Sequence, residues 1–172
     1  MAKQSILRLG NPKLHEVSVP VKEDEIHELE PVVKHLRDTL HTYRKEVGEA
    51  RGISAPQIGV MKRIIYIELD EPKVLYNPVL YKKSHQKMLI WDDCMCFPDL
   101  LVRVKRHTSC TISYRDEQWK KRREKLEGEL SELLQHECDH LFGILATSRA
   151  ADNRSFACKS ERHLLNGRFA NG

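Results

Sequence analysis

The sequence predicts a single α+β domain over residues 1–172, in which short, mostly antiparallel strands pack around a central helix carrying two histidines. Two changes of hydrophobic period predict this class. Apolar residues recur at helical spacing in residues 26–43 and again in 129–145, while the segment between them is rich in Ile, Val, Tyr and Thr. A chain of this length fits one hydrophobic core.

The first predicted element is an amphipathic helix near the N-terminus. Pro31 interrupts its pattern and fits best as the first helical residue, where its missing N–H costs nothing, so we expect regular helix from there. The apolar positions of this helix are Ile26, Leu29, Val33, Leu36, Leu40 and Tyr43.

Strands follow, and then two further helices. Residues 62–69, 73–81, 102–106 and 110–115 read as short strands. The central helix then begins near Gly128 and has Gly143 in its last turn, and residues 150–165 are expected to form a final helix. One apolar stripe on the central helix contains Leu130, Leu133, Leu134, Leu141 and Ile144.

Composition excludes several classes of protein. Hydrophobic residues make up 40% and charged residues 31% of a chain with net charge +4, which is ordinary for a globular protein. The basic run at residues 120–123 is expected to be a solvated turn, so no specific nucleic-acid partner is predicted. The N-terminus does not resemble a signal peptide, and the sequence has no run of roughly 18 apolar residues that would indicate a membrane span. The five cysteines are an odd number and do not suggest a set of disulfides. We therefore expect a cytoplasmic protein that does not contact membranes.

The central helix carries a motif with chemical meaning, His136-Glu137-Cys138-Asp139-His140. Histidines four residues apart lie about 40° apart around a helix axis, so their rings can converge on one metal ion. Glu137 falls within the apolar stripe, where a carboxylate needs a partner such as a metal-bound water. The competing interpretation is a chance HExxH on a charged helix.

A catalytic metal site usually takes three protein ligands, so a third must come from elsewhere. A histidine three residues after Gly143 would complete one known pattern, but that position is Ala146. Two candidates remain: Glu161, about twenty residues beyond His140, and Cys94, whose thiolate suits Zn²⁺ or Fe²⁺. Spacing alone does not choose between them.

Residues 52–59 form a third marked segment, rich in Gly, Ser, Ala and Pro. Small residues let the backbone approach a ligand closely, and the Gln57 amide can donate to a developing oxyanion. Taken by itself, the segment fits an ordinary turn better.

In this order the three segments resemble the peptide deformylase family, which has a GxGLAAPQ loop, an EGCLS segment and a QHExDHLxG helix. The corresponding residues here are 50–57, 92–96 and 135–143. The likeness extends through Tyr76-Asn77-Pro78, Phe97-Pro98 and Arg149, and so covers most of the chain.

The resemblance implies an enzyme that removes the formyl group from the formyl-methionine N-termini of nascent proteins and releases formate. It implies Cys94, His136 and His140 as ligands of one divalent metal, typically Fe²⁺, with Zn²⁺, Ni²⁺ or Co²⁺ as substitutes. Transient ribosome contact would accompany this role. An inactive binder of N-terminal peptides and a zinc peptidase using Glu161 are the alternatives.

The same resemblance assigns roles to individual residues. It makes Glu137 the general acid/base, and it makes the Gln57 amide and the Met95 backbone N–H donors to the oxyanion. Gly52, Ile53 and Asp93 are expected to contact substrate.

Several positions depart from the family pattern: Ala50, Ser54, Asp92, Asp93 and Cys96. We expect Asp92 to pair with Arg106, as the family's glutamate pairs with an arginine. Asp93 replaces a glycine, so it either places a negative charge beside the cleft, favouring positively charged substrates, or points to solvent.

Overall fold

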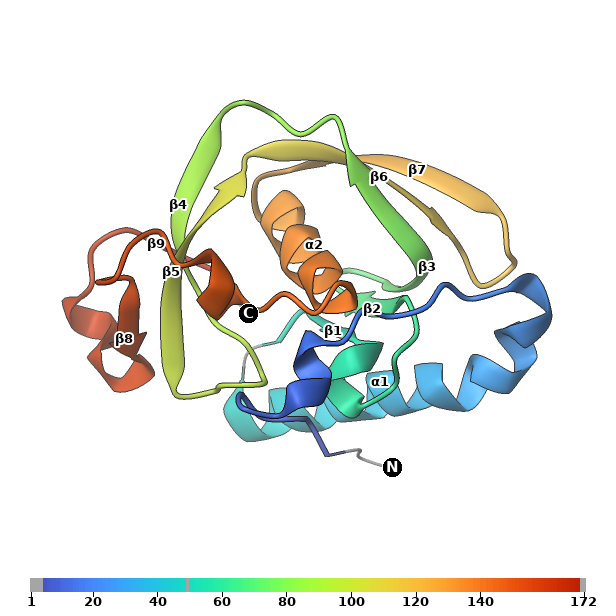
Figure 1. Ribbon diagram of the computed structural model, residues 1–172. Helices are drawn as coiled ribbons and strands as arrows, with labels where there is room; N and C mark the ends of the chain where they lie inside the picture. Colours follow the sequence, from blue (N-terminus) through green and yellow to red (C-terminus); the bar gives the residue numbers. More distant parts are fainter. Residues whose placement is uncertain (1–4, 49, 171–172) are drawn as a thin grey trace.

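The computed structural model describes residues 5–48 and 50–170, which form one α+β domain with two sheets around a central helix (Figure 1). The fold class predicted from sequence is confirmed. Among the described strands, pairing is antiparallel except between β4 and β9.

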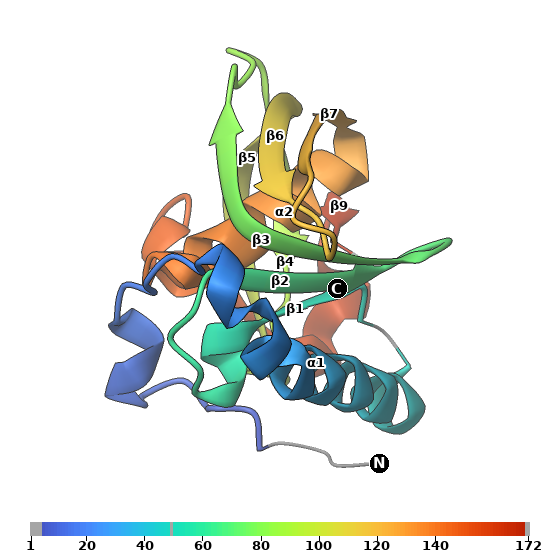
Figure 2. The same cartoon turned by 90° about the vertical axis from the view of Figure 1, so that its right-hand side faces the viewer.

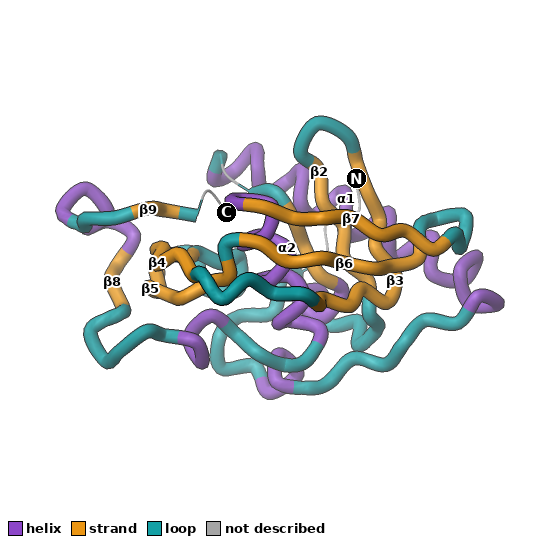
Figure 3. The backbone as a smooth tube through the Cα atoms, turned by 90° about the horizontal axis from the view of Figure 1, so that it is seen from above, coloured by secondary structure: helices purple, strands orange, loops and turns teal. Residues whose placement is uncertain are grey.

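The larger sheet has the strand order β1-β2-β3-β6-β7. Its strands are β1 (Gly52–Ser54), β2 (Ile64–Glu68), β3 (Pro72–Tyr81), β6 (Ser109–Arg115) and β7 (Lys121–Glu127). Seen from above, β6 and β7 run side by side (Figure 3). The expected strands at 62–69, 73–81 and 110–115 correspond to β2, β3 and β6.

Strand β7 corrects the expectation of a solvated turn at residues 120–123. Its side chains are largely charged, and only Leu126 is fully buried. Charged side chains protect an exposed sheet edge from pairing with other chains, and they also remove the apolar alternation by which a strand is recognised.

The smaller sheet has the order β8-β5-β4-β9, with β4 (Lys87–Asp92), β5 (Leu100–His107), β8 (Phe156–Cys158) and β9 (Arg168–Phe169). The final helix expected at residues 150–165 is therefore wrong. Ser155 hydrogen-bonds Asp152 in a turn, after which β8 pairs with the edge of β5. The helical part of this segment is a 3₁₀ helix, Lys159–Leu164.

Helix α1 (Ile26–Val47) begins earlier than Pro31, which lies inside it. The turn before Pro31 is retained because Leu29 is buried in the core with Leu36 and Leu40. Gly48 ends the helix with φ 93°, a conformation that glycine adopts without strain. Turned by 90°, the molecule shows α1 below β1 and β2 (Figure 2).

Helix α2 (Gly128–Leu141) lies between the two sheets and contacts strands of both. It begins at the predicted glycine but ends before Gly143, which has φ 68° just beyond the helix. A side chain at 143 would collide with the backbone of His15, so this close turn requires glycine. The remaining 3₁₀ helices are Pro12–His15, Glu23–Glu25, Ala55–Ile58 and Ala146–Arg149.

Candidate active site

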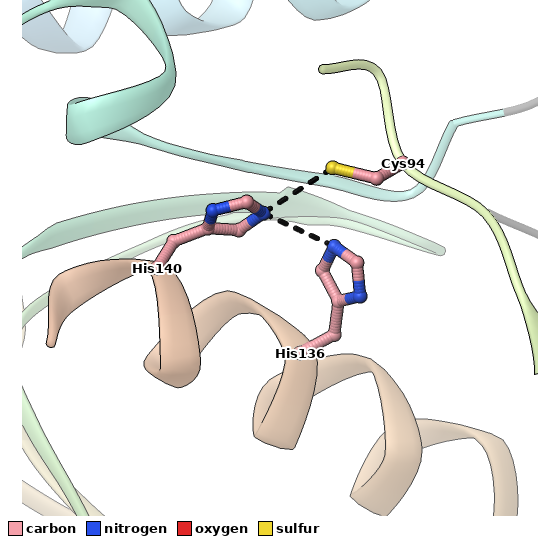
Figure 4. Close-up of side chains that lie close together, drawn as sticks. All are labelled: Cys94, His136 and His140. Atoms are coloured by element: carbon pink, nitrogen blue, oxygen red, sulfur yellow. Dashed lines mark hydrogen bonds between the residues drawn. The ribbon is translucent and has the colours of Figure 1, made fainter. Parts of the chain in front are cut away.

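The two α2 histidines and Cys94 meet in the interior, as the close-up in Figure 4 shows. Nε2 of His140 lies 3.2 Å from Nε2 of His136 and 3.3 Å from Sγ of Cys94. Among the described residues, these three form the group that could hold a metal, with ligand atoms all within 4.8 Å of one another. One thiolate and two imidazoles are a donor set suited to Zn²⁺ or Fe²⁺.

Burial disfavours the charged forms of these three side chains unless a cation is bound beside them. All three residues are at most 6% exposed. Burial raises the pKa of the Cys94 thiol and lowers the pKa of His140. A bound divalent cation would reverse the penalty on the thiolate and would use the neutral imidazole as a ligand, so the residues fit a metal.

Asp92, the last residue of β4, orients His136. Its carboxylate lies 3.0 Å from Nδ1 of His136 and 2.9 Å from a guanidinium nitrogen of Arg106. Burial opposes protonation of His136, but Asp92 outweighs burial and raises the pKa of His136 to about 10. The expected pairing of Asp92 with Arg106 is confirmed, and it leaves Nε2 of His136 directed at Cys94 and His140.

The ion pair between Asp92 and Arg106 continues to a second carboxylate, that of Asp139, which the sequence analysis did not single out. Arg106 donates to Asp139 over 2.5 Å, and Arg149 donates two further hydrogen bonds of 2.6 and 2.7 Å to the same carboxylate. Asp139 lies between the two histidines in sequence. Its position inside the HExxH motif is the one feature of the sequence that could have indicated its role. It joins α2 to β5 behind the ligands.

Glu137 is 4% exposed and lies against β1. The Ser54 hydroxyl donates a short hydrogen bond to its carboxylate. Burial raises the pKa of Glu137, while the bond from Ser54 acts in the opposite direction. A raised carboxyl pKa suits a group that takes up and returns a proton near neutral pH.

Gly52 makes room for this carboxylate. A Cβ at position 52 would lie 3.1 Å from Oε1 of Glu137 and 3.1 Å from Cγ2 of Ile67. These distances are shorter than ordinary van der Waals contact, so glycine lets β1 approach Glu137 closely without displacing either neighbour.

The Gln57 amide has a defined orientation. Its Oε1 accepts the backbone N–H of Ser54 at 2.8 Å, so Nε2 is directed at the sulfur atoms of Cys94 and Cys96, at 3.6 and 3.7 Å. The donor side of Gln57 therefore faces Cys94, one of the three candidate metal ligands.

Comparison with known proteins decides the family. The sequence model of the polypeptide deformylase family matches residues 3–156. The chain belongs to the polypeptide deformylase family. A peptide deformylase of Leptospira biflexa is 32% identical over 168 residues, covering 91% of this chain and 92% of that protein.

Solved peptide deformylases have the same fold. The structure from Synechococcus elongatus in complex with actinonin has a TM-score of 0.81 at 28% identity, covering 89% of this chain and 82% of that one. The Met-Ala-Ser-bound structure from Acinetobacter baumannii has a TM-score of 0.75 at 26% identity, covering 86% of this chain and 98% of that one.

A narrow cavity adjoins the candidate metal ligands. Gly52, Gln57, Asp93 and Met95 line it together with Cys94, His136 and Glu137. The Ile53 side chain is fully buried in the core, so only its backbone is available to a substrate.

The sequence left two positions open for the Asp93 side chain, beside the cleft or toward solvent, and the structure shows that it does not point to solvent. Its side chain is 9% exposed, and Lys159 donates to it over 2.9 Å. The negative charge expected beside the cleft is therefore balanced by a lysine from the C-terminal segment.

Two charged residues that the sequence analysis passed over also line the cavity, Arg51 and Glu132. They form an ion pair of 2.9 Å, and their side chains are 14% and 4% exposed. Burial raises the pKa of Glu132 to about 7, and Arg51 opposes this rise.

Glu161, the alternative third ligand, is exposed in the 3₁₀ helix after β8 and is absent from the cluster of ligand atoms among the described residues. The arrangement of the described residues therefore favours Cys94 over Glu161 as the third candidate ligand, and it gives the peptidase alternative no support. In the described part of the chain, every helix is too short or too polar to cross a membrane.

Proposed function

We propose that this protein is a metal-dependent hydrolase that removes the formyl group from N-terminal formyl-methionine of newly made proteins. The observation that carries the proposal is the buried convergence of Cys94, His136 and His140 beside the Glu137 carboxylate. Family membership supports the same reaction.

We propose Fe²⁺ as the native metal, with Zn²⁺, Ni²⁺ or Co²⁺ able to occupy the same ligands. When bound, the metal supplies Lewis acidity toward water and the formyl carbonyl. The donor set of one sulfur and two nitrogens is compatible with each of these ions.

Residues of this chain carry out the proton transfers, stabilise the oxyanion and border the substrate. Glu137 takes a proton from the attacking water and returns it to the departing amine, so its carboxyl group begins and ends the cycle in the same state. The Gln57 amide and the Met95 backbone N–H donate to the oxyanion that forms on the formyl group. Gly52, the Ile53 backbone and Asp93 border the bound peptide.

The substrates in this proposal are formylated N-termini of nascent chains. Transient contact with the ribosome would bring the enzyme to these ends as they emerge, in the cytoplasm. The solved relative bound to Met-Ala-Ser supports a site open to the N-terminus of a peptide.

Formate release from a formyl-Met peptide tests the proposal, using protein purified anaerobically because Fe²⁺ and a thiolate are both oxidisable. Glu137→Gln should keep its metal and lose kcat by roughly 10²–10⁴-fold. Glu161→Gln, which changes an exposed glutamate, is the matched control and should behave like wild type. Peptide binding without formate release by the wild type would instead indicate an inactive binder.

A further inference from the structure

We propose that residues 7–9, which we call the N-terminal segment, position the two oxyanion donors, Gln57 and Met95, and that Arg8 is the main positioning residue. The segment contacts the backbone beside both donors, which belong to separate parts of the chain. This inference rests on the proposed deformylation, because the oxyanion forms only when the formyl group is attacked.

The backbone of the N-terminal segment is hydrogen-bonded to both parts of the site. The N–H of Leu7 donates to the Gln57 carbonyl at 2.8 Å, and the N–H of Leu9 donates to the Cys96 carbonyl at 2.9 Å. Leu7 also packs against the buried apolar cluster that contains Cys96. The segment therefore fixes the Gln57 backbone relative to the residues that follow β4.

Arg8 lies between these two backbone contacts and holds Met95. Its Nη1 donates to the Met95 carbonyl at 2.6 Å. A hydrogen bond from a charged donor is roughly twice as strong as one between neutral groups. Arg8 is exposed overall, so changing its side chain leaves no cavity in the core.

The Met95 carbonyl belongs to the central peptide group of a tight turn. The N–H of Phe97 donates to the Cys94 carbonyl at 3.0 Å and closes this turn. The central peptide group is held at both ends, because its oxygen accepts from Arg8 and its N–H, that of Cys96, donates to the Cys94 sulfur at 3.5 Å.

Rotation of the central peptide group is the motion that converts one common turn type into another. A full rotation here is unfavourable, because it would give the non-glycine residue Cys96 a positive φ. Loss of Arg8 should therefore loosen the turn without inverting it. The Met95 N–H, which is the proposed donor, lies in this turn and would lose its fixed position.

An oxyanion donor is effective only when its position is fixed. One such donor contributes roughly 10²–10³-fold to kcat, and a displacement of about 1 Å can cost roughly 10²-fold. The oxyanion is absent from the bound ground state, so a loosened donor should lower kcat and leave KM nearly unchanged.

The test measures formate release from formyl-Met-Ala-Ser by the metal-containing wild type and by Arg8→Met, which keeps the length of the side chain and removes its donor. The variant should lose kcat by about tenfold, with KM within about twofold of wild type. Arg8→Lys, which restores a charged donor, should recover most of the loss. Met-Ala-Ser has no formyl group and should bind wild type and Arg8→Met equally.

Arg115→Met on β6 is the matched control. The Arg115 guanidinium also donates to a backbone carbonyl, that of Trp119, at 3.0 Å. Neither residue lines the cavity beside the candidate ligands, so this variant should keep the wild-type kcat.

Amide hydrogen exchange reports on the turn without turnover. In metal-containing Arg8→Met, the amides of residues 95–97 should exchange about tenfold faster than in wild type, while those of α2 should be unchanged. A wild-type kcat in the folded variant, or protection lost equally throughout the protein, would overturn the inference. Absence of formate from the wild type would overturn the proposed function, while exchange at residues 95–97 would still decide whether Arg8 holds the turn.

Discussion

At the scale of single residues, the contact between Ser54 and Glu137 affects the ionisation of the proposed general base. The resembling family has alanine at this position, and the sequence analysis treated serine as merely another small residue. The structure gives its hydroxyl a partner, the buried carboxylate of Glu137. A sequence motif shows which side chain is present but not which atom its hydroxyl meets.

Ser54→Ala should move the acid limb of the kcat/KM profile to higher pH, by about one pH unit. The hydroxyl donates to the ionised carboxylate and so lowers the pKa of Glu137; without it the pKa rises, and the base form appears only at higher pH. Ser131→Ala, at a buried serine that instead donates to the His107 carbonyl, is the control. An acid limb that stays in place would show that Ser54 does not tune Glu137.

The choice of the third ligand also belongs to this scale. Sequence spacing did not decide between Cys94 and Glu161 as the third ligand, because a ligand from another element can lie at any distance along the chain. Resemblance favoured Cys94, and the fold brings its sulfur to the histidines while Glu161 stays exposed. Arg51 and the buried Glu132 were not predicted as cavity residues, because a charged residue in a sequence usually indicates solvated surface.

At the scale of elements, β4, β5 and α2 are joined by buried charges rather than by apolar contact alone. Asp92 at the end of β4, Arg106 in β5 and Asp139 in α2 form one chain of ion pairs behind His136. The position of the Cys94 segment relative to the helix depends on this chain.

A double-mutant cycle with Asp92→Asn and Arg106→Met should show coupling of about 1 kcal/mol or more in the free energy of unfolding, measured on metal-free protein. Each single change removes one partner from a buried charge, leaving Arg106 with Asp139 alone or Asp92 with His136 alone, so the two losses should not add. Additive effects would contradict a linked pair. The same cycle at Lys125 and Glu127, on the exposed edge, should be additive.

Periodicity identified the elements that bury a continuous apolar face and missed those that do not. Helices α1 and α2 were found because Leu36, Leu40, Leu133 and Leu141 recur at helical spacing. Strand β7 carries almost only charged residues, and β8 forms because β5 has an open edge, which is a tertiary effect absent from local sequence.

At the scale of the whole molecule, the two sheets enclose α2, and Cys94, two residues beyond the end of β4, lies against the two histidines of the helix. Core packing fixes both parts: Cys94 is buried in the same cluster as Ile90 of β4, and the leucines of α2 are buried in another. The account therefore requires that the metal be retained by the folded protein through these three residues.

The most direct test is the metal content of anaerobically purified protein, compared between wild type, Cys94→Ala and Cys110→Ala. Cys110 is also a buried free cysteine but lies outside the cluster, which makes it the matched control. The account predicts about one metal ion per chain in the wild type and in Cys110→Ala, and almost none in Cys94→Ala. Full metal content in a folded Cys94→Ala protein would contradict it.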